Sequence, residues 1–161
     1  MPVTLKEGDK APNFEAFNQN GETIKLSDFE GKNLILYFYP KDDTPGCTKE
    51  ACNLRDNYEM WLSKGYSVLG VSPDEKESHQ RFIKKYDLPF SLLADTNREI
   101  MKAYGTWGEK NMYGKIKMGV LRTTFVIDGA GTILKVFKRP KTAKHTEEIV
   151  TALKKLKKWE E

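Results

Sequence analysis

The chain has 161 residues, with 27 lysines and arginines against 23 aspartates and glutamates, and 39% of its residues are apolar. This length suits one domain with a full core, and the lack of any run of about eighteen apolar residues excludes a membrane-spanning helix. Two cysteines are too few for a disulfide-stapled scaffold, so a pair at short spacing favours a catalytic role.

The N-terminal residues lack the basic-then-apolar pattern of a secretory signal, so we expect a cytoplasmic protein without a membrane partner. Residues 12–26 alternate loosely between apolar and polar side chains around Asn20-Gly21, a dipeptide typical of tight hairpin turns. This pattern predicts a small N-terminal β-hairpin before the core. Residues 33–39 follow as an unbroken apolar run, which predicts a central strand buried on both faces.

A helix is predicted over residues 47–63, because apolar side chains recur there at helical spacing and the segment ends at Lys64-Gly65. The apolar segment Tyr66–Val71 predicts a second buried strand. Strand, helix and strand form a βαβ unit, so we expect the two strands to be parallel.

The rest of the chain predicts further short elements and a closing hairpin around Gly129-Ala-Gly131. In chain order these are a helix over 75–86, a strand over 91–94, a helix over 97–104, a loop over 105–118, strands over 125–128 and 132–137, and a helix beginning near Thr146 that buries Ile149, Val150, Leu153 and Leu156. This order predicts an α/β protein: one domain over 1–161, with a mixed central sheet flanked by helices and an N-terminal β-hairpin extension.

Both cysteines lie in the stretch 40–52, between the predicted central strand and the helix. Thr44-Pro45 has the features of a helix start, with a hydroxyl at the N-cap and proline in the first helical position. Cys47 then falls in the first turn, where free backbone N–H groups and the helix dipole favour the thiolate, and Lys41 and Lys49 act in the same direction. The alternative is a small apolar core cysteine, but the polar loop before Cys47 argues against it.

Cys52 follows Cys47 by five residues, a rise of about 7.5 Å along an intact helix. A disulfide needs Cα atoms about 4.4 to 6.8 Å apart, so the two thiols cannot bridge while the helix stays wound. We therefore predict local unwinding after oxidation, in which Cys52 attacks a sulfenic acid on Cys47.

The segment Pro40-Lys-Asp-Asp-Thr44-Pro-Gly-Cys47 resembles the Pro-x-x-x-Thr-x-x-Cys active-site motif of the peroxiredoxins. A second cysteine five places later is similar to the Q-type group, also called bacterioferritin comigratory proteins. The resemblance runs along nearly the whole chain, through Gly8–Phe14, Val71–Asp74, Leu92–Asp95, Tyr104–Glu109 and Gly119–Asp128.

Together with the order of the predicted elements, this resemblance implies a thioredoxin-like fold. Within it, Cys47 would be the peroxidatic cysteine and Cys52 the resolving one. The resemblance also implies that Thr44 and Arg122 hydrogen-bond the peroxide oxygens and that Pro40 shields the pocket. Such donors, aimed at the charge that develops on the departing oxygen, lower the barrier to O–O cleavage. Without the resemblance, Thr44 is also explained as a plain helix cap and Arg122 as a surface charge at the start of a strand.

The activity implied is a thiol peroxidase that reduces hydrogen peroxide and organic hydroperoxides in antioxidant defence, with no haem, metal or flavin cofactor. The expected reductant is thioredoxin or a similar dithiol. Q-type relatives are often monomers, so we expect a monomer, with the Trp107–Met118 loop as the alternative dimer contact.

The residue pattern also raises three other functions: nucleic-acid binding, metal binding and thiol–disulfide exchange. Residues 101–161 hold 14 basic against 6 acidic residues, which allows a nucleic-acid-binding module, but most of the lysines near the C-terminus lie on the polar side of an amphipathic helix, so no nucleic-acid partner is expected. A metal site would join Cys47 and Cys52 to His79 and His145, but their spacing is not that of a zinc site, and both histidines are expected at the surface. Thioredoxin-type exchange generally uses Cys-x-x-Cys, and the gap here is wider.

Overall fold

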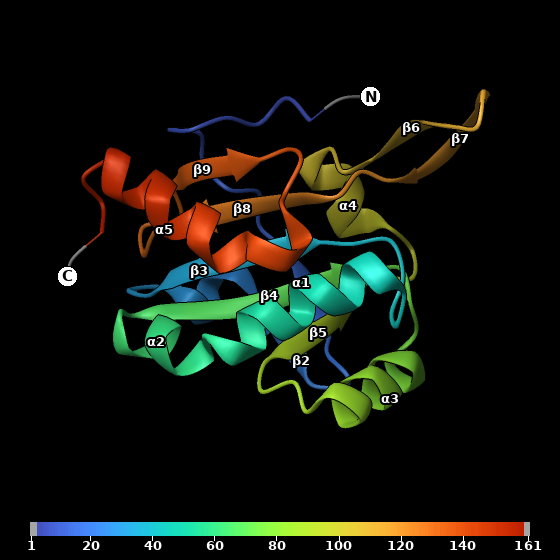
Figure 1. Cartoon of the computed structure of the whole chain (residues 1–161), viewed down its shortest axis with the longest axis horizontal. Coiled ribbons are helices and arrows are strands. Elements are labelled where there is room, and N and C mark those ends of the chain that lie inside the picture. Colours follow the sequence, from blue (N-terminus) through green and yellow to red (C-terminus); the bar gives the residue numbers. More distant parts are fainter. Residues whose placement is uncertain (1–2, 160–161) are drawn as a thin grey trace.

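A five-stranded mixed sheet forms the centre of the molecule, in the spatial order β5-β4-β3-β8-β9 (Figure 1). The first three of these strands are parallel, and β8 and β9 are antiparallel to their neighbours. The strands are β3 (Asn33–Phe38), β4 (Tyr66–Ser72), β5 (Ser91–Ala94), β8 (Thr123–Ile127) and β9 (Ile133–Phe137). The computed structural model describes residues 3–159. Met1 and Pro2, the first residues of the N-terminal segment considered above for a secretory signal, lie outside that range.

Within residues 3–159, two smaller hairpins and five α-helices surround this sheet. The hairpins are β1 (Glu15–Phe17) with β2 (Thr23–Lys25), and β6 (Trp107–Met112) with β7 (Lys115–Val120). The helices are α1 (Pro45–Asp56), α2 (Tyr58–Ser63), α3 (Lys76–Tyr86), α4 (Glu99–Tyr104) and α5 (His145–Lys155), with single 3-10 turns at Leu26–Phe29 (η1) and Thr142–Lys144 (η2). The N-terminal hairpin, the parallel βαβ unit and the closing hairpin are therefore confirmed.

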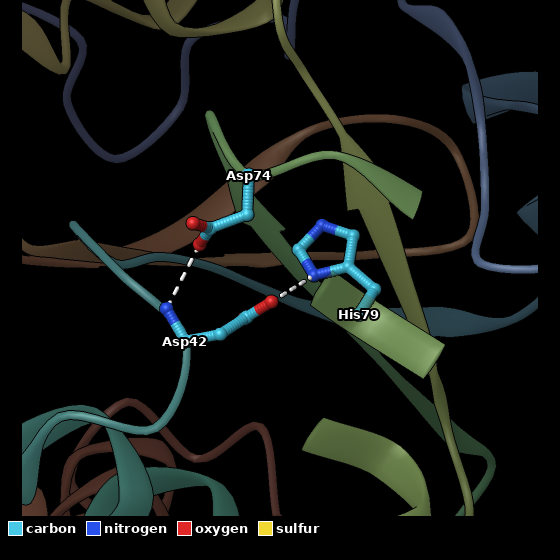
Figure 2. Close-up of side chains that lie close together, drawn as sticks. All are labelled: Asp42, Asp74 and His79. Carbon is cyan, nitrogen blue, oxygen red and sulfur yellow. Dashed lines mark hydrogen bonds and ion pairs between the residues drawn. The ribbon is translucent and has the colours of Figure 1, made fainter. Parts of the chain in front are cut away.

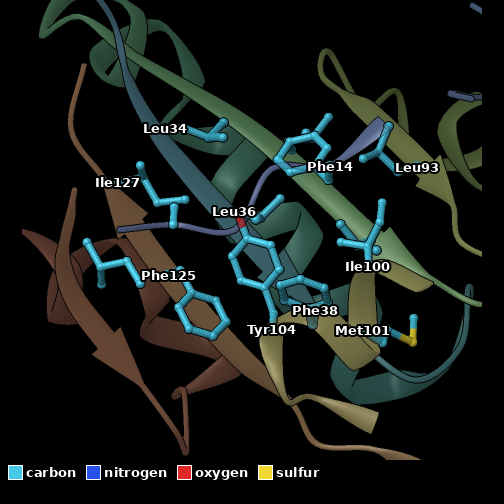
Figure 3. Close-up of a cluster of buried hydrophobic side chains, with 14 of the residues drawn as sticks. Phe14, Leu34, Leu36, Phe38, Leu93, Ile100, Met101, Tyr104, Phe125 and Ile127 are labelled. Atoms are coloured by element: carbon cyan, nitrogen blue, oxygen red, sulfur yellow. The ribbon is translucent and has the colours of Figure 1, made fainter. Parts of the chain in front are cut away.

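The central strand β3 divides its side chains between two hydrophobic cores. Leu34, Leu36 and Phe38 point to the face covered by α4 and the N-terminal hairpin, where they meet Tyr104 and Phe125 (Figure 3). The intervening Ile35 and Tyr37 point to the other face, which is covered by α1, α2 and α5. The prediction of a strand buried on both sides is confirmed, and its period of two assigns α1 to the second face.

Two predicted elements differ from the observed ones. The helix expected over 47–63 is two helices, because the backbone leaves helical geometry at Asn57, which ends α1 and precedes α2. The loop expected over 105–118 is the β6–β7 hairpin, which projects from the body of the molecule (Figure 1). Its turn is Tyr113-Gly114, both at positive φ, and such a turn gives a weaker sequence signal than Asn-Gly.

The C-terminal helix also differs in one detail. Ile149 and Leu153 of α5 are buried and Val150 packs against them, but Leu156 lies beyond the end of the helix and is exposed. Within residues 3–159, no helix combines the length and apolar character needed to cross a membrane.

Candidate active site

Cys47 lies where the chain passes from the carboxyl end of β3 into α1. Pro45 is the first residue of α1 and Thr44 is its N-cap residue, as predicted. The Thr44 hydroxyl, however, donates to the Lys41 carbonyl at 2.9 Å and makes no capping bond to the helix. Its role as a hydroxyl cap is therefore wrong: it closes the preceding loop. Cys47 follows in the first turn, with only 1% of its surface exposed.

Arg122, in the short link between β7 and β8, contacts the Cys47 sulfur. Its Nη2 donates to Sγ at 3.2 Å, and its Nη1 donates to Oε1 of Glu50 at 2.9 Å. Gly46 leaves room for this guanidinium, because a Cβ at that position would lie 3.2 Å from Nη2. Arg122 is therefore wedged between the helix backbone, a thiol and a carboxylate.

The electrostatics of this group keep Arg122 charged. Burial by itself would lower the pKa of Arg122, but the neighbouring Cys47 and Glu50 raise it above its usual range. Burial raises the pKa of the fully buried Glu50, and this is opposed by the charges of His145 and Arg122. A fixed cation beside a sulfur in the first turn of a helix favours the thiolate form of that sulfur.

The lysines expected to support the thiolate are not the ones at the site. Lys41 and Lys49 are exposed side chains. Lys110 of β6 instead interacts electrostatically with both Arg122 and Cys47. Burial and the charge of Arg122 lower the pKa of Lys110, and Cys47 acts in the opposite direction. The projecting hairpin therefore contributes a cation at the site. The prediction of a loop over residues 105–118 did not indicate this.

Cys52 lies further along α1 with a free thiol, as does Cys47. Because α1 is unbroken from Pro45 to Asp56, the two cysteines are separated by about 7.5 Å of helix rise. Burial raises the pKa of Cys52, so its thiol stays protonated at neutral pH. The two sulfurs therefore differ, since only Cys47 has a cation in hydrogen-bond contact among the residues that the structure describes.

Asp42, Asp74 and His79 form a second cluster beside the loop that leads to Cys47 (Figure 2). Nδ1 of His79 is 2.7 Å from Oδ2 of Asp42, its Nε2 is 2.9 Å from the Leu93 carbonyl, and Oδ2 of Asp74 accepts from the Asp42 backbone N–H at 2.8 Å. These atoms already satisfy one another, so the cluster is explained as a clamp that ties the loop to β4, β5 and α3. The expectation that His79 lies at the surface is wrong, because its side chain is fully buried.

His145 is also fully buried, which corrects its expected surface position. It begins α5 and lies against Glu50 and Glu148, on the side of Glu50 away from Arg122. The structure does not join the two histidines to Cys47 and Cys52 as one cluster, since among the described residues the group with metal-ligand spacing is the one around His79.

Pro40 is half-buried between β3 and the loop. Of the site residues that the sequence predicts, Cys47 and Arg122 are in contact, and Thr44 and Pro40 lie in the loop that leads to them. The sequence analysis did not predict Glu50 or Lys110 at this site, or a buried His145 beside Glu50.

Comparisons with known proteins agree with this geometry. The model of the AhpC/TSA family matches residues 7–136. The chain is 44% identical to Peroxiredoxin Bcp of Bacillus subtilis, over 94% of this chain and 97% of the relative, and 44% identical to Peroxiredoxin Bcp of Escherichia coli, over 93% and 96%.

Two solved structures are similar along most of their length. Xylella fastidiosa PrxQ superposes with a TM-score of 0.86 at 32% identity, covering 94% of this chain and 96% of that one. The bacterioferritin comigratory protein of Xanthomonas campestris, described as active in alkyl peroxide reduction, gives a TM-score of 0.82 at 33% identity, covering 89% and 91%.

Proposed function

Since the chain belongs to the AhpC/TSA family and is a peroxiredoxin with a thioredoxin-like fold, we propose that Cys47 is its peroxidatic cysteine and Cys52 its resolving cysteine. The protein is a thiol-dependent peroxidase, an oxidoreductase that acts on peroxides. Its cycle divides into an attack on peroxide by Cys47, a resolution by Cys52 and a final reduction by an external thiol.

In the first step the Cys47 thiolate attacks the terminal oxygen of a hydroperoxide. An S–O bond forms, the O–O bond breaks, and the departing oxygen leaves as an alkoxide or hydroxide that takes up a proton. Sulfur is oxidised to the sulfenic acid and the peroxide is reduced to an alcohol or water. Arg122, charged at all working pH values, stabilises the negative charge that develops on the oxygens. The Thr44 hydroxyl does the same once it turns from the Lys41 carbonyl, its partner in this structure, toward the peroxide.

In the second step the Cys52 thiol attacks the Cys47 sulfenic acid, which gives a disulfide and water. The first turns of α1 must unwind for this, because the intact helix holds the sulfurs too far apart. An external dithiol then reduces the disulfide and is itself oxidised. Pro40 restricts access to the sulfur while the helix is wound.

The observation that carries this assignment is the 3.2 Å hydrogen bond from Arg122 Nη2 to the Cys47 sulfur at the start of α1. It supports Cys47 over Cys52, since burial keeps Cys52 protonated and Cys52 has no such partner among the described hydrogen bonds. A protonated thiol is a poor nucleophile toward peroxide. Once the helix opens, Cys52 leaves the burial that raises its pKa, and the thiolate it then forms attacks the sulfenic acid.

The substrates and partners are assigned from this cycle. The substrates are hydrogen peroxide and organic hydroperoxides, and the Xanthomonas relative is described as reducing alkyl peroxides. The reductant is a thiol, and we assign thioredoxin to this role because an intramolecular disulfide calls for a dithiol. We also assign the protein to the cytoplasm, where such reductants keep thiols reduced, and to a monomeric state, because one chain carries every residue of the cycle.

The test uses peroxide consumption with thioredoxin and thioredoxin reductase. Wild type should turn over, and mass spectrometry of the oxidised protein should find one Cys47–Cys52 disulfide. Cys47→Ser should have no activity, while Thr48→Ser, a neighbouring change that leaves both thiols in place, should keep it. Peroxide consumption by Cys47→Ser at the wild-type rate would overturn the assignment.

A further inference from the structure

We propose that His145 is a positioning residue for the peroxide reaction, which holds the buried carboxylate of Glu50 so that Arg122 stays free to bind the Cys47 sulfur. The inference rests on the proposed role of Cys47. Nothing in the peroxide chemistry itself requires this histidine, since the contacts described for its ring are with Glu148, Thr124, Glu50 and Phe137 and not with either cysteine.

His145 is enclosed by polar partners from three elements. Its Nδ1 is 2.7 Å from Oε1 of Glu148, one turn further along α5. Its Nε2 is 2.8 Å from the hydroxyl of Thr124 on β8 and 3.6 Å from Oε2 of Glu50 on α1. The ring of Phe137 packs edge-on against the imidazole. This site therefore joins α5 to the helix that carries Cys47.

Glu50 is the group that needs this neighbour. Its Oε1 accepts from Arg122, whereas its Oε2 is buried without a hydrogen-bond partner among the described residues. A buried carboxylate oxygen in this state is costly unless a positive charge lies beside it. Burial raises the pKa of Glu50, and the charge of His145 opposes that shift.

With a proton on each ring nitrogen, one near Oε1 of Glu148 and the other near Oε2 of Glu50, His145 would complete a row of alternating charges from the surface to the sulfur. The row runs through Glu148, His145, Glu50, Arg122 and Cys47. Each charge is flanked by charges of opposite sign, which is the arrangement that stabilises ionised groups away from water.

Other ionisable groups that face this row leave its signs unchanged. Tyr37 on β3 faces Glu50 and stays neutral, because burial raises its pKa well above its usual value. Lys141 donates its backbone N–H to Glu148, and its charge helps to lower the pKa of that carboxyl, as does His145. Lys110 faces Arg122 and Cys47 from β6.

The consequence concerns how the guanidinium is shared. With His145 beside Oε2 of Glu50, Arg122 gives Nη1 to Glu50 and Nη2 to the sulfur. Without that imidazolium, Oε2 attracts the second nitrogen of Arg122, because a two-pronged arginine–carboxylate pair is the favoured geometry. The guanidinium then rotates away from Cys47, and the thiolate loses its hydrogen bond.

The test replaces His145 by glutamine in a Cys52→Ser parent, where Cys47 is the sole cysteine. Stopped-flow fluorescence measures the single reaction with hydrogen peroxide, and thiolate absorbance is followed across pH. We expect the reaction to slow about tenfold and the midpoint of the thiolate signal to rise by about one pH unit, the shift that matches a tenfold change in equilibrium. Thr146→Ala is the control, because it removes the neighbouring contact of α5 with the Trp61 indole and leaves Glu50 untouched.

A second variant covers the case in which His145→Gln does not fold. Glu148→Gln removes the carboxylate that favours the imidazolium at a partly exposed position, and should shift both readouts in the same direction by a smaller amount. In addition, His145→Gln should have little further effect in a Glu50→Gln background, because it acts through that carboxylate.

This inference alone is overturned if the Cys52→Ser parent reacts with peroxide but folded His145→Gln or Glu148→Gln protein shows an unchanged rate and an unchanged thiolate midpoint. It is also overturned if the effects of His145→Gln and Glu50→Gln simply add. A Cys52→Ser parent that does not react with peroxide at all overturns the proposed function, and the inference with it.

Discussion

Replacing Gly46 by alanine should separate the stability of the helix from the reactivity of its cysteine. Gly46 is the second residue of α1, and a methyl group there would lie 3.2 Å from Nη2 and 3.8 Å from Cζ of Arg122. That approach is closer than ordinary van der Waals contact, so the guanidinium must move by a few tenths of an ångström. It has little freedom to do so, because Glu50 holds its other nitrogen at 2.9 Å.

The two expected effects have opposite signs. The bond from Arg122 to the Cys47 sulfur is charge-assisted, a class worth about 1.5–3 kcal/mol, and losing roughly half of it corresponds to about a tenfold slower reaction. Alanine, however, is favoured over glycine inside helices by up to about 1 kcal/mol. In the free energy of unfolding the lost bond and the gained propensity largely offset, so it should change by no more than about 1 kcal/mol while the rate falls about tenfold.

The assay is the single reaction of Cys52→Ser protein with hydrogen peroxide by stopped flow, with urea denaturation of the same samples. Asp56→Ala is the matched control, because it improves helix propensity at the exposed last residue of α1 and does not touch Arg122. A Gly46→Ala protein that reacts as fast as its parent would refute the reasoning that the position of this guanidinium limits the rate.

Three further predictions concern the site and its surroundings. Cys52→Ser should react once with peroxide at the wild-type rate and then stop, with the sulfenic acid detected by mass spectrometry; sustained thioredoxin-dependent turnover would show that Cys52 is not needed. Asp42→Ala should lower the free energy of unfolding by about 3 kcal/mol in urea denaturation, because it leaves buried His79 without its carboxylate, and a loss below about 1 kcal/mol would contradict the clamp. Burial raises the pKa of Glu50 above its ordinary 4.5, so the stability tied to its proton is complete below pH 4.5 and is lost as pH rises through the folded value. The free energy of unfolding of Glu50→Gln should therefore increase relative to that of wild type as pH rises above 4.5. Urea denaturation in which this difference decreases as pH rises would contradict the burial argument.

Those parts of the fold that have a regular apolar pattern could be predicted from the sequence. The run at residues 33–39 indicated a strand buried on both faces, and the structure places β3 between β4 and β8. The β6–β7 hairpin was missed because its strands project from the body and most of their side chains are exposed, so no alternation marks them. The break at Asn57 was missed because the apolar spacing continues across it.

The candidate site could be predicted only as far as local sequence and the family motif reach. Proline and glycine before Cys47 indicated a helix start, and the family resemblance along the chain indicated Arg122, 75 residues away. Glu50 lies three residues after Cys47, and residues at this spacing share one side of a helix. The spacing alone could therefore have indicated Glu50 as a neighbour of the site. The burial of His79 and His145 had no such signal, because it depends on carboxylates and carbonyls brought from other elements.

The central claim is that Arg122 and the start of α1 stabilise the thiolate of Cys47 in the folded, reduced protein. The most direct measurement is the ultraviolet absorbance of the thiolate in Cys52→Ser protein as pH is varied, compared with the Arg122→Met variant. We predict that the thiolate signal persists to a lower pH when Arg122 is present than in the Arg122→Met variant. A sulfur that titrates identically in both proteins would contradict the account.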